Sequence, residues 1–214
     1  MKANNINSVL AIALCILACF NAGCLFDSDW ERDVVKNGIA FDKVTQRESG
    51  IWTGVLKENT QIQGYPCQKG WVGFNGDWTL RRFTLSEPFD IGHDTILPKD
   101  TYVVSLWQGG RIRVCALPGR MKIQGQRCIG TGGPKGVQVS FYPDGALQTF
   151  FAPQDTDIQG VPCRGGVFHI IQLHPNGSIK QATLPVDTRI NDIIYPKGKT
   201  LYFNETGQIV EKGQ

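Results

Sequence analysis

The chain has few of the side chains on which most enzymes and metal sites depend. Its 214 residues include three histidines, and these are scattered along the sequence. No pair of cysteines has the C-x-x-C spacing that zinc sites use. His93 is followed by Asp94, but one such pair without a recognisable nucleophile is weak support for acid–base catalysis. We therefore expect no metal, no cofactor and no enzymatic activity. His169 is expected to lie half-buried at the start of a strand, and His174 to be exposed at the tip of a turn.

A strong charge of one sign is also absent. The formal net charge is +3 at pH 7. This charge is too small to indicate a nucleic-acid partner or attraction to anionic lipid. Basic pairs such as Arg81 with Arg82 fall beside predicted strands, and we interpret them as parts of a solvated face.

Long apolar runs are missing, with one exception near the N-terminus. Residues 9–20 form an apolar stretch that follows Met1 and Lys2. A stretch of this length is too short to cross a hydrocarbon core of ~30 Å as a helix, but it is typical of the apolar region of an export signal. The sequence thus predicts an exported protein.

A candidate lipidation site follows the apolar stretch. Ala22 and Gly23 precede Cys24, and this order resembles a bacterial lipobox, in which signal cleavage leaves a lipidated cysteine at the new N-terminus. Asn21 departs from the pattern, which has an aliphatic residue at that place. We predict a signal peptide over residues 1–23 and a lipid anchor at Cys24.

Two alternatives to this anchor remain open. Cys19 is a rival acylation site, because it has an aliphatic residue at the right spacing, although the bulky Leu17 lies between them. Ordinary cleavage without a lipid is the second alternative. If Cys24 carries the lipid, it is followed by Leu25 and Phe26 rather than by Asp, and this order resembles lipoproteins that are sent on to an outer membrane.

Helical periodicity is absent after the signal, and the residues that favour turns are abundant instead. The chain contains 25 glycines and 11 prolines, which gather between short alternating segments and favour an all-β fold. Five hairpins recur with a period of roughly 30–35 residues, which is typical of stacked units. In each hairpin a large apolar residue precedes the turn and another follows it six residues later. These pairs are Phe74 and Leu80, Leu106 and Ile112, Phe141 and Leu147, Leu173 and Ile179, and Phe203 and Ile209.

A second phrase recurs between the hairpins. Residues 62–67 read Ile-Gln-Gly-Tyr-Pro-Cys and residues 158–163 read Ile-Gln-Gly-Val-Pro-Cys, with a looser copy at residues 123–128. We interpret each copy as a short strand followed by a corner into the next hairpin. The combination resembles uncharacterised repeat-bearing bacterial lipoproteins and secreted proteins, and more loosely the hairpin-repeat families of the MORN type. The resemblance implies no catalytic residues.

The repeats define the expected architecture. We predict an all-β fold of tandem β-hairpins, stacked as an elongated meander or solenoid-like sheet after the N-terminal signal segment. Residues 24–46 are expected to form a tether and a partial first unit, and residues 47–214 the hairpin-repeat domain.

Four cysteines fall within the repeats. Cys67, Cys128 and Cys163 occupy the same place in their units, so stacking would align them in one interior column. Cys115 aligns with Phe83, Phe150 and Ala182, which indicates an inward packing position. Buried apolar packing and at least one disulfide both remain open. Cys115 with Cys128 is the first pair to test, because one corner phrase separates them.

The five tryptophans all fall in the N-terminal half of the chain, where they serve either as core or cap residues or as a surface that stacks on sugars or partner proteins. They are Trp30, Trp52, Trp71, Trp78 and Trp107. Carboxylates such as Asp90, Asp155 and Asp187 precede the corner phrases and are expected to cap backbone amides.

Three functions are consistent with these features. The first is a membrane-anchored bacterial envelope lipoprotein with a non-enzymatic structural or binding role, whose partner is an envelope protein or a glycan. The second is a secreted β protein without a lipid and stapled by disulfides. The third is an envelope enzyme acting on glycan or peptide, with Asp77 and Glu87 as candidate carboxylates.

Overall fold

The protein forms one long antiparallel sheet with a row of small hairpins against it. The structure is a computed structural model that describes residues 29–211, and no helix occurs in this part of the chain. Thirteen strands pair in sequence order in the main sheet, which confirms the predicted all-β meander. These strands are β1 (Glu31–Lys36), β2 (Ile39–Gln46), β3 (Trp52–Leu56), β6 (Gly70–Phe74), β7 (Leu80–Thr84), β10 (Tyr102–Leu106), β11 (Ile112–Ala116), β14 (Gln138–Phe141), β15 (Leu147–Phe150), β18 (Ile171–Leu173), β19 (Ile179–Thr183), β22 (Thr200–Phe203) and β23 (Ile209–Val210).

The remaining ten strands form five two-stranded hairpins, each inserted between two hairpins of the main sheet. We call them the minor hairpins. They are β4 (Thr60–Ile62) with β5 (Tyr65–Cys67), β8 (Phe89–Asp90) with β9 (Ile96–Leu97), β12 (Met121–Ile123) with β13 (Gln126–Cys128), β16 (Thr156–Ile158) with β17 (Val161–Cys163), and β20 (Thr188–Ile190) with β21 (Ile193–Tyr195).

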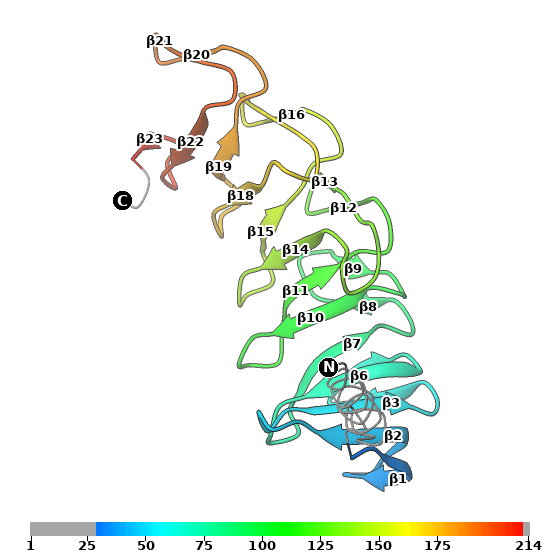
Figure 1. Cartoon of the computed structure of the whole chain (residues 1–214). Helices are drawn as coiled ribbons and strands as arrows, with labels where there is room; N and C mark the ends of the chain where they lie inside the picture. The colour runs from blue at the N-terminus through cyan, green and yellow to red at the C-terminus, as the bar shows by residue number, and fades with distance from the viewer. Residues whose placement is uncertain (1–28, 212–214) are drawn as a thin grey trace, which may run out of the picture.

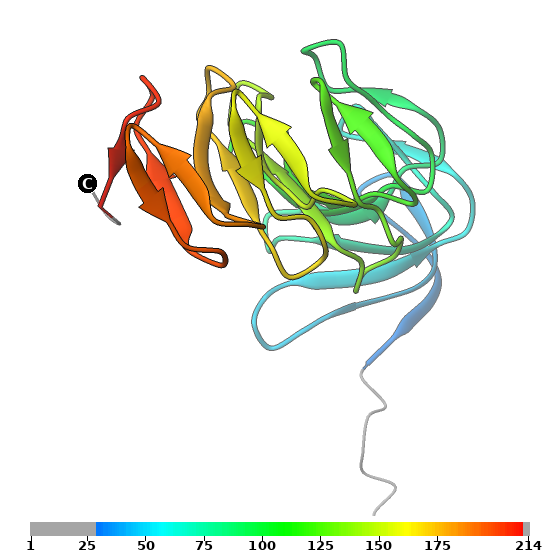
Figure 2. The same ribbon diagram turned by 90° about the horizontal axis from the view of Figure 1, so that it is seen from above.

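The minor hairpins lie along one side of the main sheet, and the sheet follows an arc from its N-terminal to its C-terminal strands (Figure 1, Figure 2). A single cluster of buried side chains contains residues of both layers, such as Phe141 of the main sheet and Ile123 of a minor hairpin. Each unit therefore buries its apolar side chains between a pair of long strands and a pair of short ones, which a lone hairpin cannot do. We call the opposite face of the main sheet the outer face.

Alternation along the strands sets which side chains enter this core. Val139 and Phe141 are fully buried, as are Phe74 and Phe83. Because successive side chains of a strand point to opposite faces, Ser140 and Tyr142 lie on the other side. The predicted inward register of the apolar residues is confirmed.

The turn of the first predicted hairpin contains an unusual residue. Trp78 stands where the other copies have glycine, and Asn75 with Gly76 offers another place for the turn two residues earlier. The turn is not shifted: Trp78 N donates to Asn75 O at 3.0 Å, as the equivalent glycines do, and Trp78 itself has a φ of 64°. Its ring stacks on Trp52 at 4.7 Å and lies 5.2 Å from Phe74. These aromatic contacts offset the cost of the left-handed backbone.

The corner phrases form a different local structure from the one expected. Instead of one strand and a corner, each Ile-Gln-Gly phrase turns back on itself, as Ile62 pairs with Tyr65 in the hairpin of β4 and β5. Gln63 and Gly64 both have positive φ, as do Gln124 and Gly125. Two consecutive left-handed residues are the mark of the tight turn that matches strand twist.

The glutamine side chain of the phrase also forms hydrogen bonds to the next main-sheet hairpin. Gln124 Oε1 accepts a hydrogen bond from Leu147 N at 2.8 Å, and its Nε2 donates to Gly145 O at 3.0 Å. Gln63 does the same for Leu80 N and Trp78 O. The minor hairpin thus fixes the turn of the next main-sheet hairpin, which explains why the phrase contains glutamine.

Side chains at the tips of the main hairpins connect neighbouring units. Trp107 Nε1 donates to Phe141 O at 3.1 Å, and Tyr142 Oη donates to Leu173 O at 2.9 Å. His174 Nε2 then lies 2.8 Å from Phe203 O. His174 is half-buried, so the expectation of an exposed turn residue was wrong: the imidazole belongs to this ladder between units.

The N-terminal edge of the sheet begins earlier than the repeats suggested. Residues 31–46, which lie within the segment assigned to a tether and a partial first unit, form β1 and β2. β1 is rich in charged residues and largely exposed. A charged edge strand disfavours pairing with a further strand.

Candidate functional site

The predicted acylation sites cannot be placed. Cys24 and its rival Cys19 both lie outside the described residues 29–211. Within those residues, the structure contains no helix that is long and apolar enough to cross a membrane.

The four repeat cysteines are buried free thiols. Cys67, Cys128 and Cys163 each end the second strand of a minor hairpin and are fully buried, which places them in the predicted interior column. Cys115 is also fully buried, on the main sheet. Burial raises the pKa of the Cys115 thiol, and the charge of Cys128 adds to this effect. Cys115 and Cys128, the pair that the sequence put first for a disulfide, are both free thiols in this structure.

Burial disfavours the reactive thiolate form of these cysteines. It raises the pKa of Cys67 and of Cys163 from the usual value of 9.0 to about 12, and it raises the pKa of Cys115 as well. A thiolate is the reactive form of cysteine, so an alkylating reagent at about pH 8 should leave all four unlabelled until the protein is unfolded. The raised pKa also makes the stability of the fold depend on pH. The thiols leave the free energy of unfolding unchanged below the unfolded pKa near 9, and they lower it as pH rises toward 12, because the unfolded chain then ionises first. Mass spectrometry of native and denatured samples, without reductant, checks the labelling. Finding all four oxidised would contradict the packing and support disulfide stapling.

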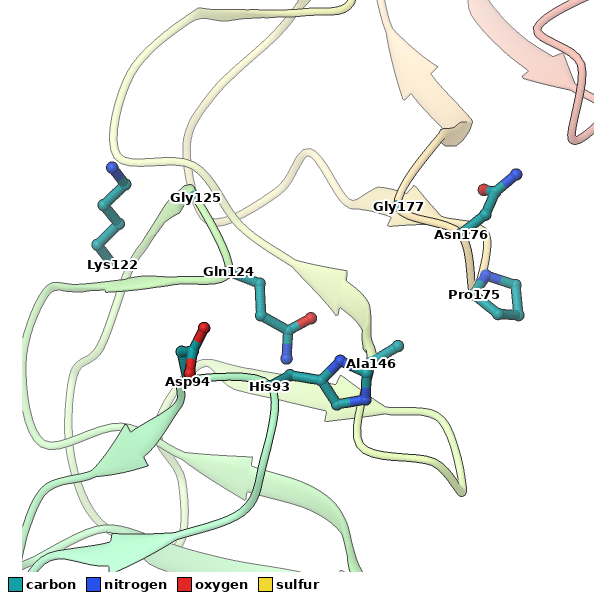
Figure 3. A pocket seen from close by; sticks show the side chains of 9 residues that line it. All are labelled: His93, Asp94, Lys122, Gln124, Gly125, Ala146, Pro175, Asn176 and Gly177. Atoms are coloured by element: carbon teal, nitrogen blue, oxygen red, sulfur yellow. The ribbon is translucent and has the colours of Figure 1, made fainter.

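The loop of His93 and Asp94 lines a hollow between the turns of three units (Figure 3). His93 Nε2 lies 3.1 Å from Asp144 O, and the side chain of Asp94 points away from the imidazole. Gln124, which also lines the hollow, already bonds to backbone groups through both the oxygen and the nitrogen of its side-chain amide. His93 and Gln124 thus both contact backbone groups of the turn at residues 144–147, and the Asp94 carboxylate does not orient the imidazole.

The carboxylates have structural partners. Asp90, Asp155 and Asp187 accept hydrogen bonds from backbone N–H groups at 2.7 to 2.8 Å, which confirms the predicted capping. Asp77 accepts from the hydroxyl and the amide of Thr79, and these bonds lower its pKa. A lowered pKa does not suit a general acid. Glu87 accepts one long contact, from Gln61 Nε2 at 3.5 Å. Among residues 29–211 no group of three or more potential metal ligands comes together.

The tryptophans divide between the two sides of the sheet. Trp52 and Trp78 pack against the core. Trp71 lies on the outer face with 58% of its surface exposed, and Trp30 meets it edge-on at 5.9 Å. The Lys43 ammonium lies 5.4 Å from the Trp71 ring. Of the two roles that the sequence left open, Trp52 and Trp78 take the core role, and Trp71 lies on the surface.

Trp71 borders a groove of 580 Å³ on the outer face. Its floor lies over β3, β6, β7 and β10, which are neighbours in the sheet (Figure 1). The lining includes Gly73, Thr84, Tyr102, Gln68, Asp100, Arg47, Lys69, Arg81 and Arg82. Sequence reasoning placed Arg81 and Arg82 on a solvated face but did not connect them with Trp71, because only the strand order brings them together.

No family model, curated protein or solved structure matches the chain. The resemblance to hairpin repeats of the MORN type therefore rests on the turn and corner motifs alone. The function has to be argued from the outer-face groove and from the N-terminal sequence.

Proposed function

We propose that the protein is a bacterial envelope lipoprotein, held at a membrane through acylated Cys24, and that its repeat sheet has a non-enzymatic binding role. The observation that carries the binding role is Trp71. Trp71 is 58% exposed and borders a groove, where its ring offers a flat apolar face that a ligand can stack on.

The titratable groups that were candidates for catalysis favour a binding role instead. His93 contacts a backbone carbonyl, Asp77 is held by its own turn, and the thiol of Cys67 is buried. Each of these groups already has a structural role. The free, buried state of the cysteines also favours the anchored protein over a secreted one stapled by disulfides. The partner is then a glycan or an envelope protein, and the sequence around Leu25 favours the outer membrane as the destination.

The anchor is tested by labelling. Cys24→Ser should abolish incorporation of a labelled fatty acid and release the protein from the membrane fraction, because the thioether needs a cysteine at the cleavage point. A diacyl anchor retains a protein stably where one chain is marginal. Cys19→Ser is the matched control and should leave labelling and fractionation unchanged. Persistent labelling of Cys24→Ser would move the acylation to Cys19, and an unlabelled wild-type protein would contradict the anchor altogether.

A further inference from the structure

One strand position on the floor of the outer-face groove, Gly73, has no side chain. Gly73 lies on the outer face, paired with Thr53 on one side and with Arg82 on the other. A Cβ placed on Gly73 would lie 3.6 Å from Arg82 Cβ and 3.8 Å from Trp52 O, which is ordinary van der Waals contact. Close packing therefore does not require glycine at this position. Without a side chain at Gly73, this part of the groove floor stays open.

Two aromatic rings border this opening. Trp71 is held in place by Trp30 and by Lys43, so that little ordering of its ring is needed when a ligand binds. Tyr102 lies half-buried on β10 and pairs with Thr84 of β7. β6 and β10 are separated by β7, so the two aromatic positions are about 10 Å apart from the spacing of strands. The Trp71 ring offers a surface on which the C–H face of a sugar ring can stack.

The rim of the groove is positively charged. Four cationic side chains line the groove, namely Arg47, Lys69, Arg81 and Arg82. The lining contains one carboxylate, Asp100, which already accepts a hydrogen bond from Gln68 at 2.7 Å. In the described part of the chain none of the four cations forms an ion pair. Unpaired guanidinium groups bind carboxylates with two parallel hydrogen bonds. The rim therefore favours an anionic ligand.

The position of the groove disfavours a peptide ligand. Extended peptides bind most readily by adding a strand to an open sheet edge. The strands beneath the groove are all interior, since β3, β6, β7 and β10 are each bonded on both sides. Their backbone groups are unavailable, and recognition has to come from side chains: aromatic faces, hydroxyls, an amide and guanidinium groups.

We infer that the outer-face groove binds an acidic glycan, with a sugar ring stacked on Trp71 and its carboxylate held by the rim arginines. This inference rests on the proposed binding role and specifies its ligand class. Hydroxyl and amide groups of Thr53, Thr84 and Gln68 offer partners for sugar hydroxyls.

The test uses the full-length protein in detergent micelles and a fluorescent oligogalacturonate, which is a chain of uronic acids. We expect saturable binding that weakens with added salt, as it should for an exposed charged site. A neutral glucose chain of the same length should bind about tenfold more weakly or worse. Single-stranded DNA and a polyglutamate peptide, as anions of other classes, should also bind more weakly.

Three variants of groove residues test whether the uronate chain binds in the groove. Trp71→Ala, Arg82→Ala and Gly73→Val should each weaken it by about tenfold or more, as for central residues of an interface. Gly73→Val is the sharpest variant, because it fills the floor with a side chain that strands favour, and its unfolding midpoint should not fall. Phe168→Ala removes an aromatic side chain that is 90% exposed outside the groove, and Arg189→Ala removes an exposed arginine of a minor hairpin. Both controls should bind normally.

Three results would overturn the inference: no binding of the uronate chain, equal binding of DNA or polyglutamate, or unchanged binding by a folded Gly73→Val variant. Fatty-acid labelling of Cys24 is measured separately. A protein that is acylated but does not bind the uronate chain would contradict the ligand class while leaving the anchor in place.

Discussion

Phe141→Ala should destabilise the protein by about 3–5 kcal/mol, the cost of removing a fully buried aromatic ring from a core that cannot collapse around the gap. The ring is completely buried, and it belongs to the cluster shared by the main sheet and the minor hairpins. The loss should appear as a lower midpoint in urea unfolding monitored by circular dichroism.

Three further variants are compared with Phe141→Ala. Tyr142→Phe removes only the hydroxyl that donates to Leu173 O and should cost about 1 kcal/mol. Phe203→Ala should cost less than Phe141→Ala, because Phe203 lies in the last hairpin of the sheet and has a neighbouring unit on one side only. Tyr142→Ala removes a ring on the opposite face, and if it were as damaging as Phe141→Ala, the strand register would be wrong by one residue.

Gln124→Leu should cost about 2–3 kcal/mol, because it leaves Leu147 N and Gly145 O without partners beneath the next unit. The two side chains have similar volumes, so packing changes little. Gln159→Leu is the matched control: Gln159 makes one longer bond, to Ile179 N at 3.2 Å, and is exposed. It should cost about 1 kcal/mol or less. Equal losses in the two variants, measured by urea unfolding, would show that the glutamine is not what connects the units.

The main-sheet hairpins could be predicted from the sequence because each carries two independent signals. Apolar residues alternate along the strands, and glycine marks the turn, as at Gly145 and Gly177. The minor hairpins could not be predicted as hairpins, since glutamine at a positive φ is not a recognised turn signal. Gln63 and Gln124 adopt it because their side chains bond to the following unit, and that gain is invisible until the units are stacked.

The candidate site was only partly predictable for a similar reason. The sequence identifies Trp71, Arg81 and Arg82 as notable residues, but the alternation alone does not tell which face of the sheet meets the minor hairpins. The groove depends on that choice and on the side-by-side order of β3, β6, β7 and β10. The absence of a side chain at Gly73 gives no sequence signal at all, because glycine is frequent throughout this chain.

The proposed lipid anchor would place this sheet at an envelope membrane, and the mass of the mature N-terminal peptide tests it most directly. We expect a peptide that begins at Cys24 and carries a diacylglyceryl group in thioether linkage, as for a protein held by two acyl chains. An unmodified N-terminal peptide, with the protein recovered in the soluble fraction, would contradict the account and favour a secreted protein.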